Sequence, residues 1–180
     1  MVTMTIDGLT VQVPEGTTIL EAAKTAHIRI PHLCYLKGIN EIAACRVCCV
    51  EVEGERAMVT ACNTPVREGM VVHTNSPRAR TTRRINVELI LSDHNTNCAS
   101  CIKSGNCTLQ SLANDFNMRG EHYPTKLRRE AVDYSTPLIR ENDKCVKCMR
   151  CIQICENVQT VKIWDLLGTG SRATVDASRN

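Results

Sequence analysis

Twelve cysteines, gathered into three groups along 180 residues, are the feature that most limits how this chain can fold. Only 3% of the residues are aromatic, so metal centres or disulfides are expected to stabilise parts of the fold. The first residues, "MVTMTIDGLT", carry no secretion signal, and no apolar run is long enough to span a membrane. We therefore expect a cytoplasmic, reducing location, where clustered cysteines are more often ligands than disulfide partners.

The third group has the most specific spacing, Cys145-x2-Cys148-x2-Cys151-x3-Cys155. Bacterial ferredoxins bind a four-iron cubane cluster at this spacing, and the fourth cysteine of the motif typically serves a different cluster. A single zinc ion has less use for three ligands from one short turn. This group therefore favours iron–sulfur clusters at all three groups over zinc or a disulfide framework.

The first group is Cys34, Cys45, Cys48 and Cys62. Cys45 and Cys48 are two residues apart and can hold one iron, while the two distant cysteines complete a four-ligand site. The spacing is a variant of the plant-type two-iron ferredoxin pattern, and zinc would also accept these four thiolates. Cys49 is predicted to be a buried apolar residue, because its side chain points to the other side of an extended backbone.

The second group is His94-x3-Cys98-x2-Cys101-x5-Cys107. A four-iron cluster usually takes four thiolates, and only three cysteines lie within easy reach. Spacing alone leaves open whether His94 is the fourth ligand or a surface histidine. The other histidines have no such context and are expected to be structural or solvated: His27, His32, His73 and His122.

Residues 1–75 are predicted to form a small sheet with one helix packed across it. "VTMTIDG" and "LTVQVPEG" alternate around Asp7-Gly8, which predicts a hairpin. Thr17 or Thr18 can cap a helix over "ILEAAKTA". "CVEVEG" and "RAMVTAC" predict a second hairpin around Gly54, and "MVVHT" a final strand.

Ser76 and Pro77 predict the start of a helix over 77–92, where apolar residues recur at helical spacing. "TLQSLANDF" predicts a shorter helix, residues 119–143 a polar connection, and "GTGSRATVDASRN" a tail without a packing element. Four arginines crowd the first half of the long helix, where the helix dipole disfavours cations. The favoured interpretation is that these arginines form a solvated face, and the alternative is that they contact an acidic partner. The residues are Arg78, Arg80, Arg83 and Arg84.

The chain resembles a known family in "IPHLCYLKGINEIAACRVCCVEVEG", "ACNTPV", "LILSDHNTNCASCIKSGNCTLQ" and "CVKCMRCIQICENVQ". These stretches are similar to the N-terminal iron–sulfur region of iron-only (FeFe) hydrogenases. They are also similar to the large iron–sulfur subunit of respiratory complex I, and to related subunits of bacterial NAD-linked formate dehydrogenases and hydrogenases. The resemblance covers roughly residues 1 to 165 and keeps the three spacings in the family's order.

The resemblance implies an α+β architecture in three parts. Residues 1–76 would form a β-grasp ferredoxin-like domain with a 2Fe-2S cluster on the four cysteines of the first group. Residues 77–118 would form a helix with a 4Fe-4S cluster on His94, Cys98, Cys101 and Cys107. Residues 119–180 would hold the connection and a truncated bacterial-ferredoxin-like unit with a 4Fe-4S cluster on Cys145, Cys148 and Cys151.

The match departs from the family at the C-terminal end. Hydrogenase-type members carry a second cysteine motif and a catalytic domain downstream, and this sequence ends at Asn180 with neither. Glu156, not Pro, follows Cys155, as in the first motif of such a pair. Cys155 is therefore assigned either to a second cluster beyond this sequence or to the same cluster as its neighbours. We expect the sequence to be one segment of a longer protein.

The expected function is transfer of single electrons through a row of clusters. No acid–base pair, activated nucleophile or nucleotide-binding glycine loop stands out, so no active centre is expected in this chain. The resemblance implies a hydrogen-activating domain or subunit, flavin- and NAD(P)-binding subunits, and ferredoxin as candidate partners. Nucleic acid is not an expected partner, since the net charge is only +3 and aromatic and basic residues do not interleave. The alternatives are a complex I-like or formate dehydrogenase-like subunit and, from another class, a zinc-stabilised interaction protein.

Overall fold

The computed structural model describes residues 1–118, 123, 131–134 and 137–177. Contacts divide the chain into two compact units. Met1–Tyr35 and Glu41–Asn86 form the first, and Leu36–Asn40 and Val87–Asn180 form the second. Among the described residues, no helix is both long and apolar enough to cross a membrane.

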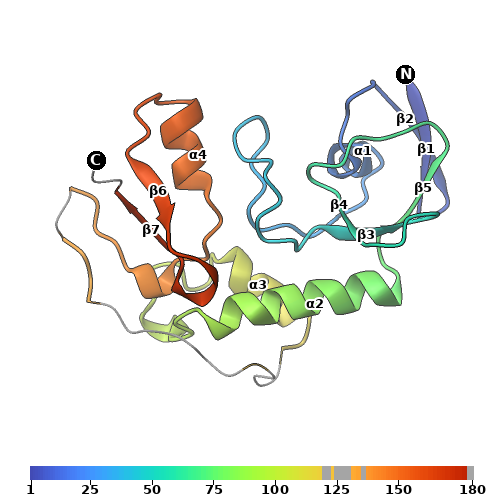
Figure 1. Cartoon of the computed structure of the whole chain (residues 1–180). Coiled ribbons are helices and arrows are strands. Elements are labelled where there is room, and N and C mark those ends of the chain that lie inside the picture. The colour runs from blue at the N-terminus through green and yellow to red at the C-terminus, as the bar shows by residue number, and fades with distance from the viewer. Residues whose placement is uncertain (119–122, 124–130, 135–136, 178–180) are drawn as a thin grey trace. The chain divides into compact units, whose positions relative to one another are not determined.

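The first unit is built on a mixed five-stranded sheet in the order β2-β1-β5-β3-β4 (Figure 1). β1 pairs in parallel with β5, and the other pairs are antiparallel. Asp7 and Gly8 both have positive φ, as the tight turn of the first hairpin requires. Both predicted hairpins and the predicted final strand are confirmed. The strands are β1 Val2–Ile6, β2 Leu9–Val13, β3 Cys49–Val52, β4 Val59–Thr60 and β5 Met70–His73.

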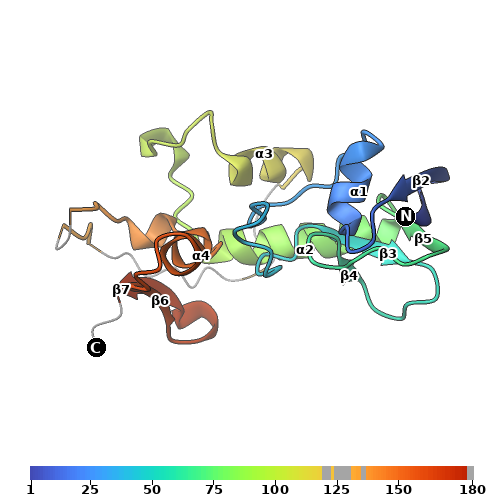
Figure 2. The same ribbon diagram turned by 90° about the horizontal axis from the view of Figure 1, so that it is seen from above.

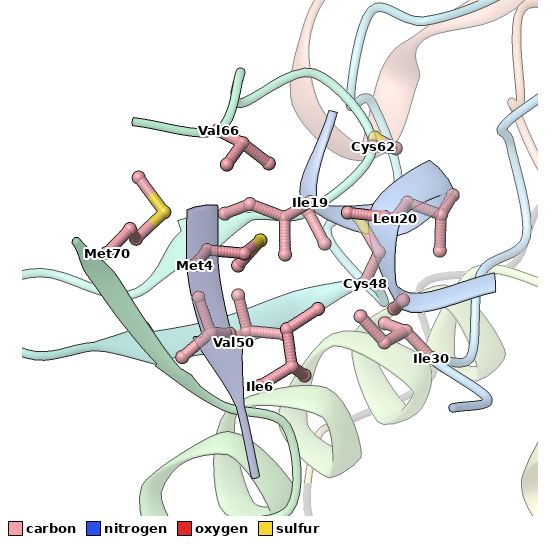
Figure 3. Close-up of a cluster of buried hydrophobic side chains, with 14 of the residues drawn as sticks. Met4, Ile6, Ile19, Leu20, Ile30, Cys48, Val50, Cys62, Val66 and Met70 are labelled. Carbon is pink, nitrogen blue, oxygen red and sulfur yellow. The ribbon is translucent and has the colours of Figure 1, made fainter. Parts of the chain in front are cut away.

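One helix, α1 (Ile19–Thr25), packs on this sheet. The Thr18 hydroxyl accepts a hydrogen bond from the Glu21 N–H at 3.4 Å, which confirms one of the two predicted caps. The buried face of α1 meets β-branched and aliphatic side chains of the strands in one apolar cluster (Figure 3). Cys48 and Cys62 belong to this cluster, so two of the predicted ligands are part of the apolar core.

The long helix α2 runs from Pro77 to Ser92, as predicted, and the Ser76 Oγ accepts a hydrogen bond from the Ala79 N–H at 3.1 Å. Arg78 forms an ion pair with Glu51 at 2.6 Å. The prediction of a solvated arginine face is wrong for Arg83, whose exposed fraction is only 4%. Because Arg83 lies one helical turn after the fully buried Ala79, it falls on the inner face of the helix.

Over its described residues, the second unit consists of loops, short helices and the β6–β7 hairpin. Figure 2 shows α4 beside the β6–β7 hairpin, and the predicted short helix after Cys107 is confirmed as α3. The prediction of a tail without a packing element is wrong. The elements are η1 Cys98–Ser100, α3 Thr108–Asp115, η2 Asn142–Lys144, α4 Arg150–Asn157, β6 Trp164–Leu167, η3 Gly170–Arg172 and β7 Thr174–Ala177.

Contacts from outside the hairpin hold β7 in place. The Arg140 guanidinium pairs with Asp176 at 2.9 Å and lies 4.8 Å from the centre of the Trp164 ring. Val175 is buried, and its carbonyl accepts a hydrogen bond from the Arg140 guanidinium at 3.1 Å. The tail sequence shows no periodicity because each strand of this two-stranded hairpin is too short to produce a recognisable pattern. Much of the predicted connection at 119–143 lies outside the described residues.

Candidate metal centres

All twelve cysteines carry free thiols. Those of the first group form two pairs. The Cys34 and Cys45 thiols hydrogen-bond to each other, and so do the thiols of Cys48 and Cys62. The Cys34 backbone N–H also donates to the Cys45 Sγ at 3.4 Å. The structure thus pairs Cys45 with Cys34 rather than with its sequence neighbour Cys48.

Local structure fixes these four thiols. Ala43 and Arg46 have positive φ, which wraps the loop around Cys45. Cys48 lies directly before β3. Cys62 follows Ala61, whose carbonyl accepts the Leu20 N–H at 2.8 Å, so the end of β4 is tied to α1. Cys34, Cys48 and Cys62 are at most 1% exposed.

Hydrogen bonding within each pair polarises the thiols. The bond from Cys34 lowers the pKa of Cys45 to about 5, and the same bond raises the pKa of Cys34. The bond from Cys62 likewise lowers the pKa of Cys48 and raises that of Cys62. Each pair therefore contains one cysteine whose thiolate form is favoured. A metal ion binds cysteine in this thiolate form.

The two pairs fit a two-iron cluster, because each iron of such a cluster takes two protein ligands. Cys49 belongs to neither pair. It is buried as predicted, and burial raises its pKa to about 11.

His94 lies two residues beyond the end of α2, and its N–H donates to the Leu91 carbonyl at 3.2 Å. Its Nδ1 is buried and has no hydrogen-bond partner within the described part of the chain. Burial also lowers the pKa of the imidazole, which favours the neutral form. A neutral ring with a buried, unpaired nitrogen fits a metal ligand better than it fits a surface histidine.

The three cysteines after His94 lie on a compact loop. Cys98 begins η1, and the Cys101 N–H donates to the Cys98 carbonyl at 3.1 Å. Cys107 occupies the N-cap position of α3. The charge of Lys144 acts on both His94 and Cys101, so these two face the same cation.

The third group wraps around a tight turn. The Lys147 N–H donates to the Cys145 Sγ at 3.4 Å, and Lys147 and Met149 both have positive φ. Burial raises the pKa of Cys145 and Cys151, and the charge of the neighbouring Cys148 adds to both shifts. The first three cysteines of the motif therefore lie within electrostatic reach of one another.

Cys155 has a different environment. It lies on α4 with an exposed fraction of 3%, and its Sγ accepts a hydrogen bond from the Ile163 N–H at 3.2 Å. Its carbonyl accepts the N–H groups of Val161 and Lys162. These bonds join the end of α4 to the segment that leads into β6.

Two contacts that sequence reasoning missed join the second group to the third. Asn95 and Asp143 form two hydrogen bonds, and Asp93 forms an ion pair with Lys147. Asp93 and Asn95 flank His94, whereas Asp143 and Lys147 flank Cys145. No pattern in the sequence predicts these contacts, since their partners are about 50 residues apart. The buried Asn40 also donates from its Nδ2 to the Cys148 carbonyl at 2.8 Å.

Comparisons with known proteins match two regions of the chain to iron–sulfur families. Residues 1–77 match the family described as a 2Fe-2S iron-sulfur cluster binding domain. Residues 83–122 match the NADH-ubiquinone oxidoreductase-G iron-sulfur binding region. The predicted 2Fe-2S and 4Fe-4S cofactors are thereby confirmed.

The chain is 49% identical to the NADP-reducing hydrogenase subunit HndD of Solidesulfovibrio fructosivorans over 97% of its own length and 31% of that protein. It therefore spans about a third of this curated relative. The structure of an NAD+-reducing [NiFe]-hydrogenase superposes with a TM-score of 0.90 at 29% identity, covering 98% of this chain and 75% of that one.

The gamma subunit of the NAD-reducing hydrogenase HoxS of Cupriavidus necator is 36% identical over 97% of this chain and 75% of its own length. The relation extends across both units and all three cysteine groups. The chain belongs to the family of iron–sulfur proteins that includes this gamma subunit.

Proposed function

We propose that this chain relays single electrons, through a 2Fe-2S cluster and two 4Fe-4S clusters, between a flavin-bearing partner and a hydrogen-activating centre outside this sequence. Residues 1–76 would be a β-grasp ferredoxin-like domain, which the strand order β2-β1-β5-β3-β4 with one helix across the sheet supports. Residues 77–118 and 119–180 would be the two cubane modules.

The geometry of the cysteine groups supports the following ligands. The two thiol pairs would hold the 2Fe-2S cluster, one pair on each iron. His94 with Cys98, Cys101 and Cys107 would hold one cubane. Cys145, Cys148 and Cys151 would supply three ligands to the other, and Cys155 would not be one of them. The clusters supply reversible one-electron chemistry, while the protein sets their potentials through ligand type, hydrogen bonds and burial.

The observation that carries the relay function is the direct connection between the second and third ligand groups. The contacts of Asp93 and Asn95 with Lys147 and Asp143 hold His94 and Cys145 in neighbouring loops of the same unit. Electron tunnelling weakens steeply with distance, so a relay needs its clusters side by side. A protein that used metal only to stabilise its fold would have no need of two adjacent redox centres.

A hydrogenase context is favoured because the NADP-reducing hydrogenase subunit is 49% identical to this chain. Among hydrogenases, we assign the chain to the iron-only type, and the sequence motifs that resemble that family support this assignment. The proposed partners are the hydrogen-activating domain or subunit, flavin- and NAD(P)-binding subunits, and ferredoxin, in the cytoplasm. A complex I-like subunit is the second candidate, since residues 83–122 match a region named for that enzyme.

Redox-titrated EPR of the protein tests the proposal. We expect one two-iron signal, and two cubane signals that broaden each other when both clusters are reduced. Cys62→Ala should remove only the two-iron signal, and Cys101→Ala only the cubane on His94. A protein that contains zinc and no acid-labile sulfide would contradict the relay and support the zinc-stabilised alternative.

A further inference from the structure

Arg83 is a buried cation in the first unit. Its side chain leaves the inner face of α2, and its Nε–H donates to the Cys49 carbonyl at 2.8 Å. Its Nη2 is buried and has no hydrogen-bond partner among the residues that the structure describes. Two other arginines of the helix are engaged at its exposed side, since Arg78 pairs with Glu51 and Arg80 donates to the Asn75 carbonyl.

A guanidinium stays charged at all ordinary pH values, and an uncompensated buried charge is costly. Asp7 acts on Arg83 from a distance, but its carboxylate accepts hydrogen bonds from the N–H and hydroxyl of Thr74. Within the described residues, no carboxylate forms an ion pair with Arg83. The remaining groups whose charge reaches it are the thiols of Cys48 and Cys49.

We propose that Arg83 is the counter-charge of the 2Fe-2S cluster and raises its reduction potential. This inference rests on the proposed ligands Cys34, Cys45, Cys48 and Cys62. A two-iron cluster with four thiolates is anionic, and it takes up one further negative charge when one electron enters. A fixed buried cation stabilises the reduced state more than the oxidised state, and solvent and salt screen it poorly.

The bond to Cys49 gives Arg83 a fixed position relative to the ligand before it. Cys48 and Cys49 are consecutive and buried, and Cys49 is the first residue of β3. The rigid fork of the guanidinium keeps the Nε–H on the Cys49 carbonyl, and the charge stays within electrostatic reach of Cys48. Arg83 is therefore a positioning and tuning residue, and no bond to it forms or breaks during electron transfer.

The test is redox-titrated EPR of the two-iron signal in the full chain with its clusters. Arg83→Gln should lower the midpoint potential, and the shift should persist at high salt. Arg84→Gln removes the same charge from the neighbouring exposed position and should leave the potential unchanged. Arg83→Lys keeps the charge and should lie closer to wild type than Arg83→Gln does.

Three outcomes would overturn the inference. These are an unshifted potential in Arg83→Gln with an intact two-iron signal, equal shifts in Arg83→Gln and Arg84→Gln, and equal shifts in Arg83→Gln and Arg83→Lys. If Arg83→Gln fails to retain the cluster, Arg83→Met is the second variant, because methionine fills the same space without charge. An unshifted midpoint potential in Arg83→Met would count equally against the inference. Absence of any two-iron signal in the wild-type protein would instead contradict the ligand assignment.

Discussion

Asn95 and Asp143 are joined by two hydrogen bonds. The Asn95 backbone N–H donates to the Asp143 carbonyl at 2.7 Å, and the Asn95 Nδ2 donates to the Asp143 carboxylate at 2.8 Å. The Asn95 Oδ1 in turn accepts the Asn97 N–H at 3.0 Å. A single side chain therefore shapes the loop after His94 and ties that loop to the segment before Cys145.

Asn95→Asp should destabilise this connection. The carboxylate keeps an acceptor for the Asn97 N–H, but it removes the donor to Asp143 and places a like charge beside it. A lost hydrogen bond to a charged group costs about 1.5–3 kcal/mol, so we expect a loss of that order. Denaturant titration of the cluster-loaded protein, followed by visible absorbance, measures it. Asn97→Asp at an exposed position is the control, and equal midpoints for the two variants would contradict the prediction.

His94→Ala should lose one cubane, because no spare cysteine lies nearby. His94→Cys should keep the cubane but lower its potential, since a thiolate adds a negative charge that a neutral imidazole does not. His73→Ala, which removes an exposed ring paired with Glu53, is the control. EPR of all three variants separates the cases. An unaltered cubane in His94→Ala would show that His94 is not a ligand.

Cys155→Ser should leave the cubane of the third group in place. The Cys155 Sγ is already satisfied by the Ile163 N–H, and a serine oxygen can accept the same bond. Cys151→Ser should instead perturb or remove that cubane. Iron and acid-labile sulfide content, together with the EPR signal, compare the two. Loss of the cluster in Cys155→Ser would make Cys155 a local ligand.

Cys45 should be more acidic than its partner Cys34 in the metal-free protein. Its pKa of about 5 means that the thiolate predominates above this pH and disappears as pH falls through it. Cys49, with a pKa of about 11, stays protonated at neutral pH. Iodoacetamide at neutral pH should therefore modify Cys45 long before Cys49, as peptide mass mapping would show. Cys34→Ala removes the hydrogen bond and should move Cys45 labelling to higher pH.

Removal of the clusters should affect the two units differently. The first unit has a continuous apolar core around Met4, Ile6 and Ile19, whereas the second has few buried apolar side chains among its described residues. Folding of metal-dependent segments is coupled to metal binding. Hydrogen exchange after iron chelation should show retained protection in β1, β5 and α1 and lost protection around Cys98–Cys107 and in α4. Uniform protection throughout would contradict this.

Local signals in the sequence determined where the turns and helices of the first unit begin. Asp7-Gly8 set the first turn, Thr18 the start of α1, and Ser76-Pro77 the start of α2, because each acts through neighbouring backbone groups. Cysteine spacing likewise predicted three candidate ligand groups, since cysteines two residues apart can reach one cluster. The C-terminal hairpin was missed because its order depends on Arg140 and other distant contacts.

The sequence by itself predicted which residues are candidate metal ligands and determined where helices and turns begin. Only the tertiary structure decided that Cys45 pairs with Cys34, that Arg83 is the buried arginine of four, and that Asn95 meets Asp143. The physical reason is that spacing and capping act over a few residues. Burial, pairing of thiols and contacts between loops depend on how distant segments pack, and no local pattern records that packing.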